Sequence, residues 1–471
     1  MDKLLKTLWQ SPTLMTWGSF LAKTLSLVVV LPLILTRLGV EEISLWYLFA
    51  TIIGFQLLVD VGFSPTFSRV IAYAMGGAGV KDLRRPDGTC SGKPNWSTLE
   101  QICSTMQAIY LRLSLLWLFV LASLGTLSLI RPVSIAPDTP AAWYAWFFII
   151  VTSTISFYGN IYNSYLQGIN QVALLRRWEI FSSLGAIATS FIVLIFGGKL
   201  LSLVVANQTW QILNVYRNRF LSNMVEKGRF KSFSAKTYSK YVLNAVWPSA
   251  WRSGLGIIMT YGLIQASGII YAQIGDVTSV ATYLLGLRFI QTISTFSQAP
   301  FYSRLPLLAR LYAEGKTKKL VLQAQKGMIF SFWSFTIGFI GLGLTGTPLL
   351  KYLKSNADFP SFQLWVFLGL AFFLQRYGAM NIQLYSLTNH IIWHISNGIS
   401  GAIFIILSIV LFNFIDIYAF PIALLIGYMC FHVWYPAILS HKLFSLKFPT
   451  FEIKILLFPL LAIISFIIFK I

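Results

Sequence analysis

Residues 57–78 read LLVDVGFSPTFSRVIAYAMGGA, an apolar, helix-like run that is interrupted near its middle. Asp60 and Arg69 bring opposite charges into this run, and the helix breakers Gly62 and Pro65 lie between them. An ionisable group at membrane depth costs roughly 2.5–3.5 kcal/mol even on mild insertion scales, so it usually faces a bundle interior or a wet cavity. The pattern predicts a broken membrane helix. Its two charges either line a functional lumen or mark the polar ends of one span.

The composition of the chain excludes a soluble globular protein. Of 471 residues, 56% are hydrophobic and only 11% are charged, which leaves too few charged side chains to cover a water-exposed surface. Uninterrupted apolar runs of about 20 residues favour membrane-spanning helices, whereas the strands of a β-barrel would alternate. We therefore predict an all-α, polytopic protein of the lipid bilayer.

The apolar runs divide the chain into two sets of six spans. They cover about 14–36, 43–73, 106–130, 142–167, 179–197 and 200–216, then 246–272, 278–300, 325–349, 361–386, 393–413 and 417–439. A further run at 451–469 is a candidate thirteenth span. The predicted organisation is an N-terminal six-helix lobe (1–222), a basic cytoplasmic linker (223–245), a C-terminal six-helix lobe (246–440) and an additional helix (450–471).

The distribution of Lys and Arg predicts the orientation in the membrane. The net charge is +21, and the cations flank the spans instead of forming a detached basic domain, so nucleic acid is not predicted as a partner. With the N-terminus in the cytoplasm, 24 Lys and Arg fall in inside segments and six in outside segments. Because cytoplasmic loops carry the excess of positive charge, the N-terminus is predicted to be cytoplasmic.

The two halves of the chain resemble one another. Residues 67–69 (FSR) match residues 302–304 (YSR), and residues 158–171 (YGNIYNSYLQGINQ) resemble residues 377–390 (YGAMNIQLYSLTNH). Six spans per half is an even number, so both halves enter the membrane in the same orientation, which predicts a parallel repeat. Two such bundles would enclose a central cavity and rock against each other.

Six cations lie within the predicted spans, whereas Asp60 is the one carboxylate that is clearly intramembrane. These cations are Lys23, Arg69, Arg112, Arg252, Arg288 and Arg376. Arg69 and Arg112 lie near enough to the cytoplasmic end to snorkel. Lys23, Arg288 and Arg376 lie about ten residues, or roughly 15 Å, from the nearer end of their spans. Such a surplus of deep positive charge predicts an anionic ligand or a water-filled cavity, although each Arg could instead cap carbonyls at a helix end.

Four stretches resemble the Wzx-type polysaccharide (O-antigen) flippases. They are LPLILTRLGVEEISLWYLF from residue 31, the run at 57–78, YLQGINQVALLRRWEI from residue 165 and RYGAMNIQLYSLTNHIIWHISNG from residue 376. These flippases belong to the multidrug/oligosaccharidyl-lipid/polysaccharide (MOP) exporter superfamily, together with the multidrug and toxin extruders (MATE) and the lipid II flippase. The resemblance implies two six-helix lobes around a cavity and transport by alternating access. It also implies a multi-pass protein of the bacterial inner membrane.

The resemblance implies a substrate as well. Flippases of this family move an undecaprenyl-pyrophosphate-linked oligosaccharide from the cytoplasmic to the periplasmic leaflet through a cationic lumen. Lys23, Arg252 and Arg288 fit the lumen cations of the family. Drug extruders of the superfamily use acidic cavity groups, and this chain has Asp60 alone, which argues against a cationic drug. A pyrophosphate suits Arg because the guanidinium fork donates paired hydrogen bonds and stays charged.

For the other polar residues of the spans, the sequence leaves both a functional and a structural role open. Tyr158, Asn160 and Asn163 belong to an amide and phenol cluster that either contacts sugar rings or joins membrane helices by hydrogen bonds. Asp60 is either the coupling site for H⁺ or Na⁺ or the partner of Arg69 or another cation in a salt bridge. The two histidines His390 and His394 and the three cysteines have no metal-site spacing, so neither a metal nor a cofactor is predicted.

Two competing functions use the same observations. A membrane glycosyltransferase, polymerase or ligase would need acidic residues at an outer loop, and Glu41 with Glu42 is the only outer acidic pair, so an enzyme is not predicted. A cation- or proton-coupled multidrug or metabolite antiporter of the same fold is the main alternative to the flippase. Nothing in the sequence requires an oligomer, and a monomer is expected.

Overall fold

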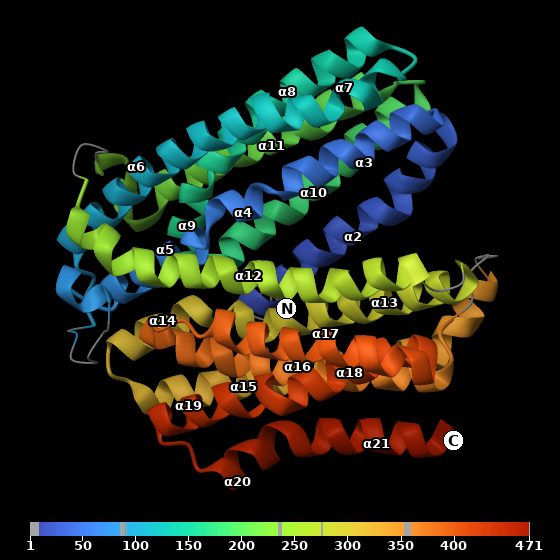
Figure 1. Ribbon diagram of the computed structural model, residues 1–471. Helices are drawn as coiled ribbons and strands as arrows, with labels where there is room; N and C mark the ends of the chain where they lie inside the picture. Colours follow the sequence, from blue (N-terminus) through green and yellow to red (C-terminus); the bar gives the residue numbers. More distant parts are fainter. Residues whose placement is uncertain are drawn as a thin grey trace. The chain divides into compact units, whose positions relative to one another are not determined.

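The computed structural model describes residues 9–84, 90, 92–233, 238–274, 277–352 and 359–470, and the regular elements in these ranges are helices (Figure 1). The chain divides into two compact units. The first unit ends at Ala250 and the second begins at Trp251, so the division falls inside one long helix, α12 (Lys240–Ile274). The first residues of α12 therefore pack with the N-terminal unit.

In the described part of the chain, the first unit contains ten further α-helices, coloured blue to green in Figure 1. They are α2 (Pro12–Arg37), α3 (Val40–Gly54), α4 (Gln56–Asp60), α5 (Phe63–Met75), α6 (Trp96–Val120), α7 (Thr126–Ser134), α8 (Thr139–Tyr158), α9 (Asn160–Gly168), α10 (Val172–Ile195) and α11 (Leu200–Met224). A π-helical turn joins α6 to α7, so these two helices form one continuous span.

The second unit contains the rest of α12 and, within its described residues, nine further α-helices, coloured yellow to red in Figure 1. They are α13 (Val277–Tyr302), α14 (Leu305–Ala313), α15 (Thr317–Tyr352), α16 (Phe362–Tyr385), α17 (Trp393–Ile415), α18 (Ala419–Gly427), α19 (Trp434–Phe444), α20 (Phe448–Glu452) and α21 (Phe458–Lys470). Together the units form the all-α, polytopic, MATE-like fold that the sequence predicts.

Eight stretches of the described helices are long and apolar enough to cross a membrane. They include α2, α10 and α15, the joined pair α6–α7, and the C-terminal stretch Phe448–Lys470. The remaining predicted spans coincide with α11, α12, α13 and α16, which have 25, 35, 26 and 24 residues. At a rise of about 1.5 Å per residue, each of these four helices exceeds the hydrocarbon thickness of roughly 30 Å.

The break in the run at 57–78 lies at Gly62, one of the breakers that the sequence marks. Helix α4 ends at Asp60, Val61 and Gly62 adopt left-handed φ values of 48° and 73°, and α5 begins at Phe63. Pro65 therefore lies in the first turn of α5, where its missing N–H interrupts no helical hydrogen bond. The backbone turns at Gly62, which adopts positive φ without steric cost.

The repeat is visible in the backbone of both units. Asn170, which follows α9, and Asn389, which follows the short turn after α16, both adopt left-handed φ values, of 65° and 60°. These two asparagines occupy matching positions in the similar stretches 158–171 and 377–390. Asparagine tolerates this conformation better than most residues, so both units end a span by the same local device.

The C-terminal helix α21 packs on the second unit. The Phe466 ring lies edge-on to Phe339 of α15, with 5.8 Å between ring centroids. On α20, the buried Glu452 carboxylate accepts hydrogen bonds from Tyr377 of α16 (2.9 Å) and from His441 of α19 (2.7 Å). The segment after residue 447 is thus tied to the unit by an aromatic contact and by a buried polar contact.

Close packing of α5 on α9 predicts a large effect of a small substitution. A Cβ atom at Gly168 would lie 2.5 Å from Ile71 and 2.8 Å from the backbone oxygen of Ser68, whereas a Cβ at Gly341 of α15 would meet nothing within 4 Å. We expect Gly168→Ala to destabilise the protein by about 1–3 kcal/mol, as overpacking typically does. Gly341→Ala should be neutral or stabilising, because Ala favours a helix interior over Gly.

Thermal unfolding of the purified variants in detergent tests this expectation. A lower midpoint for Gly168→Ala alone is expected. Equal midpoints for the two variants would contradict the close approach of α5 and α9.

Candidate functional site

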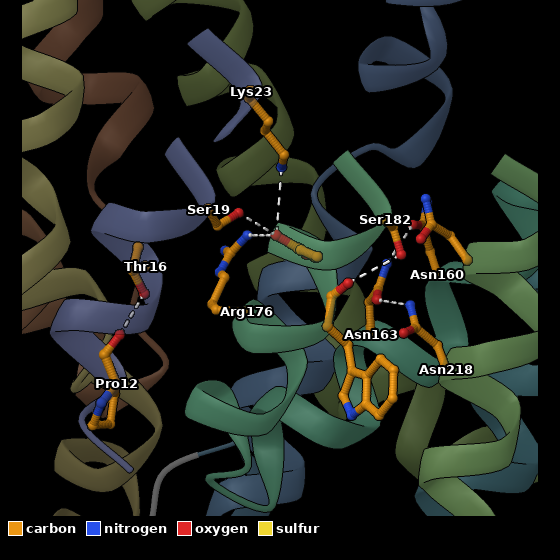
Figure 2. Close-up of polar contacts among 12 residues, drawn as sticks. Pro12, Thr16, Ser19, Lys23, Asn160, Asn163, Arg176, Ser182 and Asn218 are labelled. Atoms are coloured by element: carbon orange, nitrogen blue, oxygen red, sulfur yellow. Dashed lines mark hydrogen bonds and ion pairs between the residues drawn. The ribbon is translucent and has the colours of Figure 1, made fainter. Parts of the chain in front are cut away.

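A carboxylate between α2 and α10 collects three polar side chains (Figure 2). Glu179 Oε2 accepts hydrogen bonds from Ser19 Oγ (2.7 Å) and Arg176 Nη1 (2.8 Å), and it lies 3.5 Å from Lys23 Nζ. Ser19 and Lys23 are four residues apart on α2, so they share one face of that helix. Arg176 and Glu179 are three residues apart on α10 and are likewise neighbours.

The two cations at Glu179 are not equivalent. The side chain of Arg176 is 23% exposed and makes a short ion pair, whereas that of Lys23 is 55% exposed and makes a long one. Such a long contact to an exposed ammonium contributes little to stability. Arg176 therefore balances the Glu179 carboxylate, and the charge of Lys23 remains available to a ligand.

A separate amide network joins α9, α10 and α11 (Figure 2). Asn218 Nδ2 donates to Asn163 Oδ1 (2.7 Å), and Asn163 Nδ2 donates to Asn160 Oδ1 (3.4 Å). The guanidinium of Arg217 donates to Asn218 Oδ1 (2.7 Å) and Ser182 Oγ (2.5 Å), both of which are neutral groups. The network thus satisfies the donors of Arg217 without cancelling its charge.

Two predicted site residues, Asn160 and Asn163, take part in this network, and a third, Tyr158, lies next to them in the sequence. Asn163 is engaged through both its oxygen and its nitrogen, so it joins α9 to α11. Asn160, the first residue of α9, is half-buried and makes one bond within the network. Tyr158 is half-buried at the end of α8.

Asp60 lies at the helix break and is 8% exposed. Its Oδ1 accepts a hydrogen bond from Tyr110 (2.7 Å), and its Oδ2 accepts one from the backbone N–H of Ser64 (3.1 Å), which belongs to the first turn of α5. Within the described part of the chain, no Lys, Arg or His lies within 4.0 Å of this carboxylate. Asp60 is thus held by a phenol and a backbone amide instead of a cation.

Arg376 on α16 is the most deeply buried of the predicted site cations, at 3% exposure. Its Nη2 donates to the backbone oxygen and to the Oγ of Ser294, both at 2.6 Å. This guanidinium joins α16 to α13 within the second unit.

The other predicted cations have different surroundings. Arg69 is half-buried on α5, and Arg288 is exposed on α13. Arg252 is half-buried on α12, 5.4 Å from the ring centroid of Trp251. Arg112 is exposed on α6 and lies 5.2 Å from the ring centroid of Tyr238. The described residues contain no group of three or more His, Cys, Asp or Glu side chains that could hold a metal ion.

Lys23, Asn160 and Asn163 are predicted site residues that take part in these contacts, whereas Arg176 and Arg217 are not among the predicted ones. Both were interpreted only as cytoplasmic charges of the positive-inside pattern. The i,i+3 spacing of Arg176 and Glu179 on one helix was a usable signal. The contact between Glu179 and α2 could not be predicted from the sequence, because Ser19 and Glu179 are 160 positions apart.

Solved structures of MATE transporters share this fold. A crystal structure of a MATE mutant aligns with a TM-score of 0.74 at 13% identity, covering 93% of this chain and 95% of that chain. An outward-facing multidrug resistance MATE family transporter of the MOP superfamily aligns with a TM-score of 0.69 at 14% identity, covering 95% and 98%. At this identity the likeness establishes the fold alone.

A third solved structure is described by the polarity of its pocket. It is a MOP superfamily transporter from Pyrococcus furiosus, for which a reverse polarity of the binding pocket suggests a different function. It aligns with a TM-score of 0.69 at 14% identity, covering 93% of this chain and 97% of that chain. Comparisons with family models and with curated proteins give no match.

The unequal roles of the two cations at Glu179 can be tested by stability. Glu179→Gln leaves Arg176 without its counter-charge, and we expect a loss of about 2 kcal/mol, within the range for a hydrogen bond between charged groups. Lys23→Gln should cost less than about 1 kcal/mol, because exposed ion pairs contribute little. The measurement is the unfolding midpoint of each purified variant. Equal losses of stability in Glu179→Gln and Lys23→Gln would contradict the unequal roles of Arg176 and Lys23.

Proposed function

We propose that this protein is a flippase that moves an undecaprenyl-pyrophosphate-linked oligosaccharide from the cytoplasmic to the periplasmic leaflet by alternating access. The substrate would be the repeat unit of O-antigen or another surface polysaccharide. The observation that carries the proposal is the surplus of cations at the Glu179 cluster, where Lys23 is 55% exposed and only loosely paired. One carboxylate there faces two cations in direct contact.

The substrate chemistry suits this surplus. A pyrophosphate carries concentrated negative charge and cannot cross hydrocarbon unaided, because moving a charge to the bilayer centre is costly. Exposed ammonium and guanidinium groups replace part of its hydration by charge-assisted hydrogen bonds. We assign this role to Lys23, Arg252 and Arg288, with Arg69 as a further contact. Several dispersed cations, rather than one tight clamp, would allow the headgroup to bind and to leave.

The remaining predicted site residues have different roles in this proposal. Asn160 and Tyr158 are half-buried and are proposed to contact sugar hydroxyls. Asn163 is proposed to hold Asn160 in position, since both ends of its amide are already bonded. Arg376 is proposed as a structural group, because its Nη2 is occupied by Ser294.

The setting of the protein is part of the same proposal. It would lie in the bacterial inner membrane with a cytoplasmic N-terminus, act as a monomer, and draw on a gradient of H⁺ or Na⁺. The six-helix lobes predicted at 1–222 and 246–440, with the linker 223–245 and the added helix 450–471, would be its moving parts. The reverse pocket polarity described for the Pyrococcus furiosus transporter gives a precedent within this fold for a departure from drug export.

A second candidate function is ion-coupled antiport of a drug or metabolite. The observation that favours it is Asp60, a buried carboxylate whose described partners are a phenol and a backbone amide. Such a carboxylate could bind H⁺ or Na⁺ in either function. The functions differ in the charge of the substrate, and the cations of the chain favour an anion.

Leaflet-resolved analysis in cells of the native host tests the flippase. We expect Lys23→Ala and Arg288→Ala each to reduce translocation roughly tenfold or more, because a hydrogen bond to a charged group contributes about 1.5–3 kcal/mol. Lipid-linked repeat units should then accumulate on the cytoplasmic face. Arg131→Ala, an exposed cation near the end of α7, is the matched control and should behave as wild type. Normal surface glycan without accumulation in a deletion strain would refute the flippase and favour the antiporter.

Ion coupling through Asp60 can be tested with Asp138 as a control carboxylate. Asp138 also accepts a hydrogen bond from a backbone N–H, that of Ala141 (3.0 Å), but at the start of α8 in a polar turn. We expect Asp60→Asn to lower gradient-driven transport by roughly tenfold or more, because an amide keeps the capping bond but holds no exchangeable charge. Asp138→Asn should leave transport within about twofold of wild type, since a lost cap affects stability by about 1 kcal/mol. The readout is surface glycan with and without a protonophore or sodium ionophore, and an Asp60→Asn protein that retains ionophore-sensitive transport would contradict the assignment.

A further inference from the structure

A pocket of about 370 Å³ lies within the first unit, beside the helix break, and shares no lining residue with the Glu179 cluster. Phe63 of α5, Ile109 of α6 and Trp247 of α12 line its apolar part. Arg112, Tyr238 and Asn244 supply its polar groups. A volume in this range is typical of small-molecule sites, which are mainly apolar with a few placed polar groups.

The charge in this pocket is not neutralised by the protein. Within the described ranges, Arg112 takes part in no ion pair. Its guanidinium instead lies over the ring of Tyr238, 5.2 Å from the centroid, an arrangement that orients a cation without cancelling its charge. The pocket therefore suits an amphipathic ligand with one anionic end.

The spacing of charges along one span indicates the depth of the pocket. Between Arg112 and Arg131 the chain has no charged residue, and the helix that carries them is continuous. The 19 positions between these two arginines (112 to 131) correspond to roughly 28 Å, close to the ~30 Å thickness of the hydrocarbon core. Arg112 and Arg131 therefore lie at opposite faces of the membrane. On the positive-inside orientation, Arg112 lies near the cytoplasmic end of this span, and its side chain reaches toward the headgroups.

Aromatic residues around the pocket agree with an interfacial position. Trp247 is 48% exposed and Tyr241, which precedes the pocket residue Leu243 on α12, is 81% exposed. Trp and Tyr are enriched where hydrocarbon meets headgroups. The cytoplasmic leaflet is also rich in anionic lipids, and basic pockets between membrane helices on that side bind their headgroups.

We propose that this pocket binds an anionic phospholipid of the cytoplasmic leaflet, with its phosphate on the Arg112 guanidinium and the first part of its acyl chains against Phe63, Ile109 and Trp247. The bound lipid fastens the start of α12 to α6. A hydrogen bond from the backbone N–H of Ser239 to Thr105 Oγ1 (3.1 Å) already joins the same two segments. The lipid is a resident of the pocket and is independent of what the protein transports.

Native mass spectrometry of the purified full-length protein tests this proposal. Phosphatidylglycerol and phosphatidylcholine with the same acyl chains are titrated in separate series. We expect the first phosphatidylglycerol to bind roughly tenfold more tightly than phosphatidylcholine, the contribution of one charge-assisted contact. Arg112→Gln should bring the two affinities within about twofold of each other. Trp247→Ala should weaken both lipids and preserve their ratio.

Matched variants separate this pocket from the general positive charge of the protein. Arg131→Gln removes a cation at the other face of the membrane and should keep the wild-type ratio. Arg112→Lys keeps the charge and should retain most of the selectivity, which also covers the case in which Arg112→Gln fails to fold. A photoactivatable phosphatidylglycerol should cross-link to peptides that contain residues 109–113 or 243–247.

Three outcomes would overturn the proposal. The first is equal binding of the two lipids by the wild-type protein. The second is selectivity that survives Arg112→Gln or is lost equally in Arg131→Gln. The third is displacement of phosphatidylglycerol by millimolar inorganic phosphate, which would identify the ligand as a free phosphate.

Discussion

The first unit depends on how the Glu179 carboxylate is neutralised. Glu179 lies on α10 and is held by Ser19 of α2 and by Arg176 of its own helix, so the two helices are joined by a polar contact inside an apolar interface. Below it, Val30 and Ile34 of α2 pack against Ile187 and Leu194 of α10. Because an unpaired charge in an apolar interface is costly, the carboxylate is balanced by the nearer cation, Arg176, whereas Lys23 is held only loosely.

The all-α, polytopic fold could be predicted from the sequence, because the membrane imposes length and hydropathy on every span. The predicted runs coincide with helices, and the repeat between 158–171 and 377–390 reappears as the left-handed Asn170 and Asn389. The break falls at Gly62, one of the residues that the pattern marks. Gly, Ser and Pro all mark a break in the pattern, but only the backbone distinguishes a left-handed Gly62 from a Pro65 accommodated in the next helix.

The candidate site could be predicted only in part, because its contacts join residues distant in sequence. Lys23 was predicted as a deep cation, but its distance to Glu179 depends on the packing of α2 against α10. Burial also distinguishes residues that the sequence groups together: Arg376 is 3% exposed and bonded to Ser294, whereas Arg288 is exposed. The hydrophobic pattern of a span that is apolar on most faces does not predict which of its arginines is buried.

The central claim is that the cations of this protein serve an anionic lipid-linked substrate. The most direct test is the thermal unfolding midpoint of the purified protein with undecaprenyl pyrophosphate and, separately, with the organic cation tetraphenylphosphonium. A ligand at one hundred times its Kd stabilises a protein by about 2.7 kcal/mol. The account predicts a clear rise in midpoint with the pyrophosphate lipid, its loss in Lys23→Ala, and no change with the cation. Stabilisation by the cation and none by the pyrophosphate lipid would contradict it.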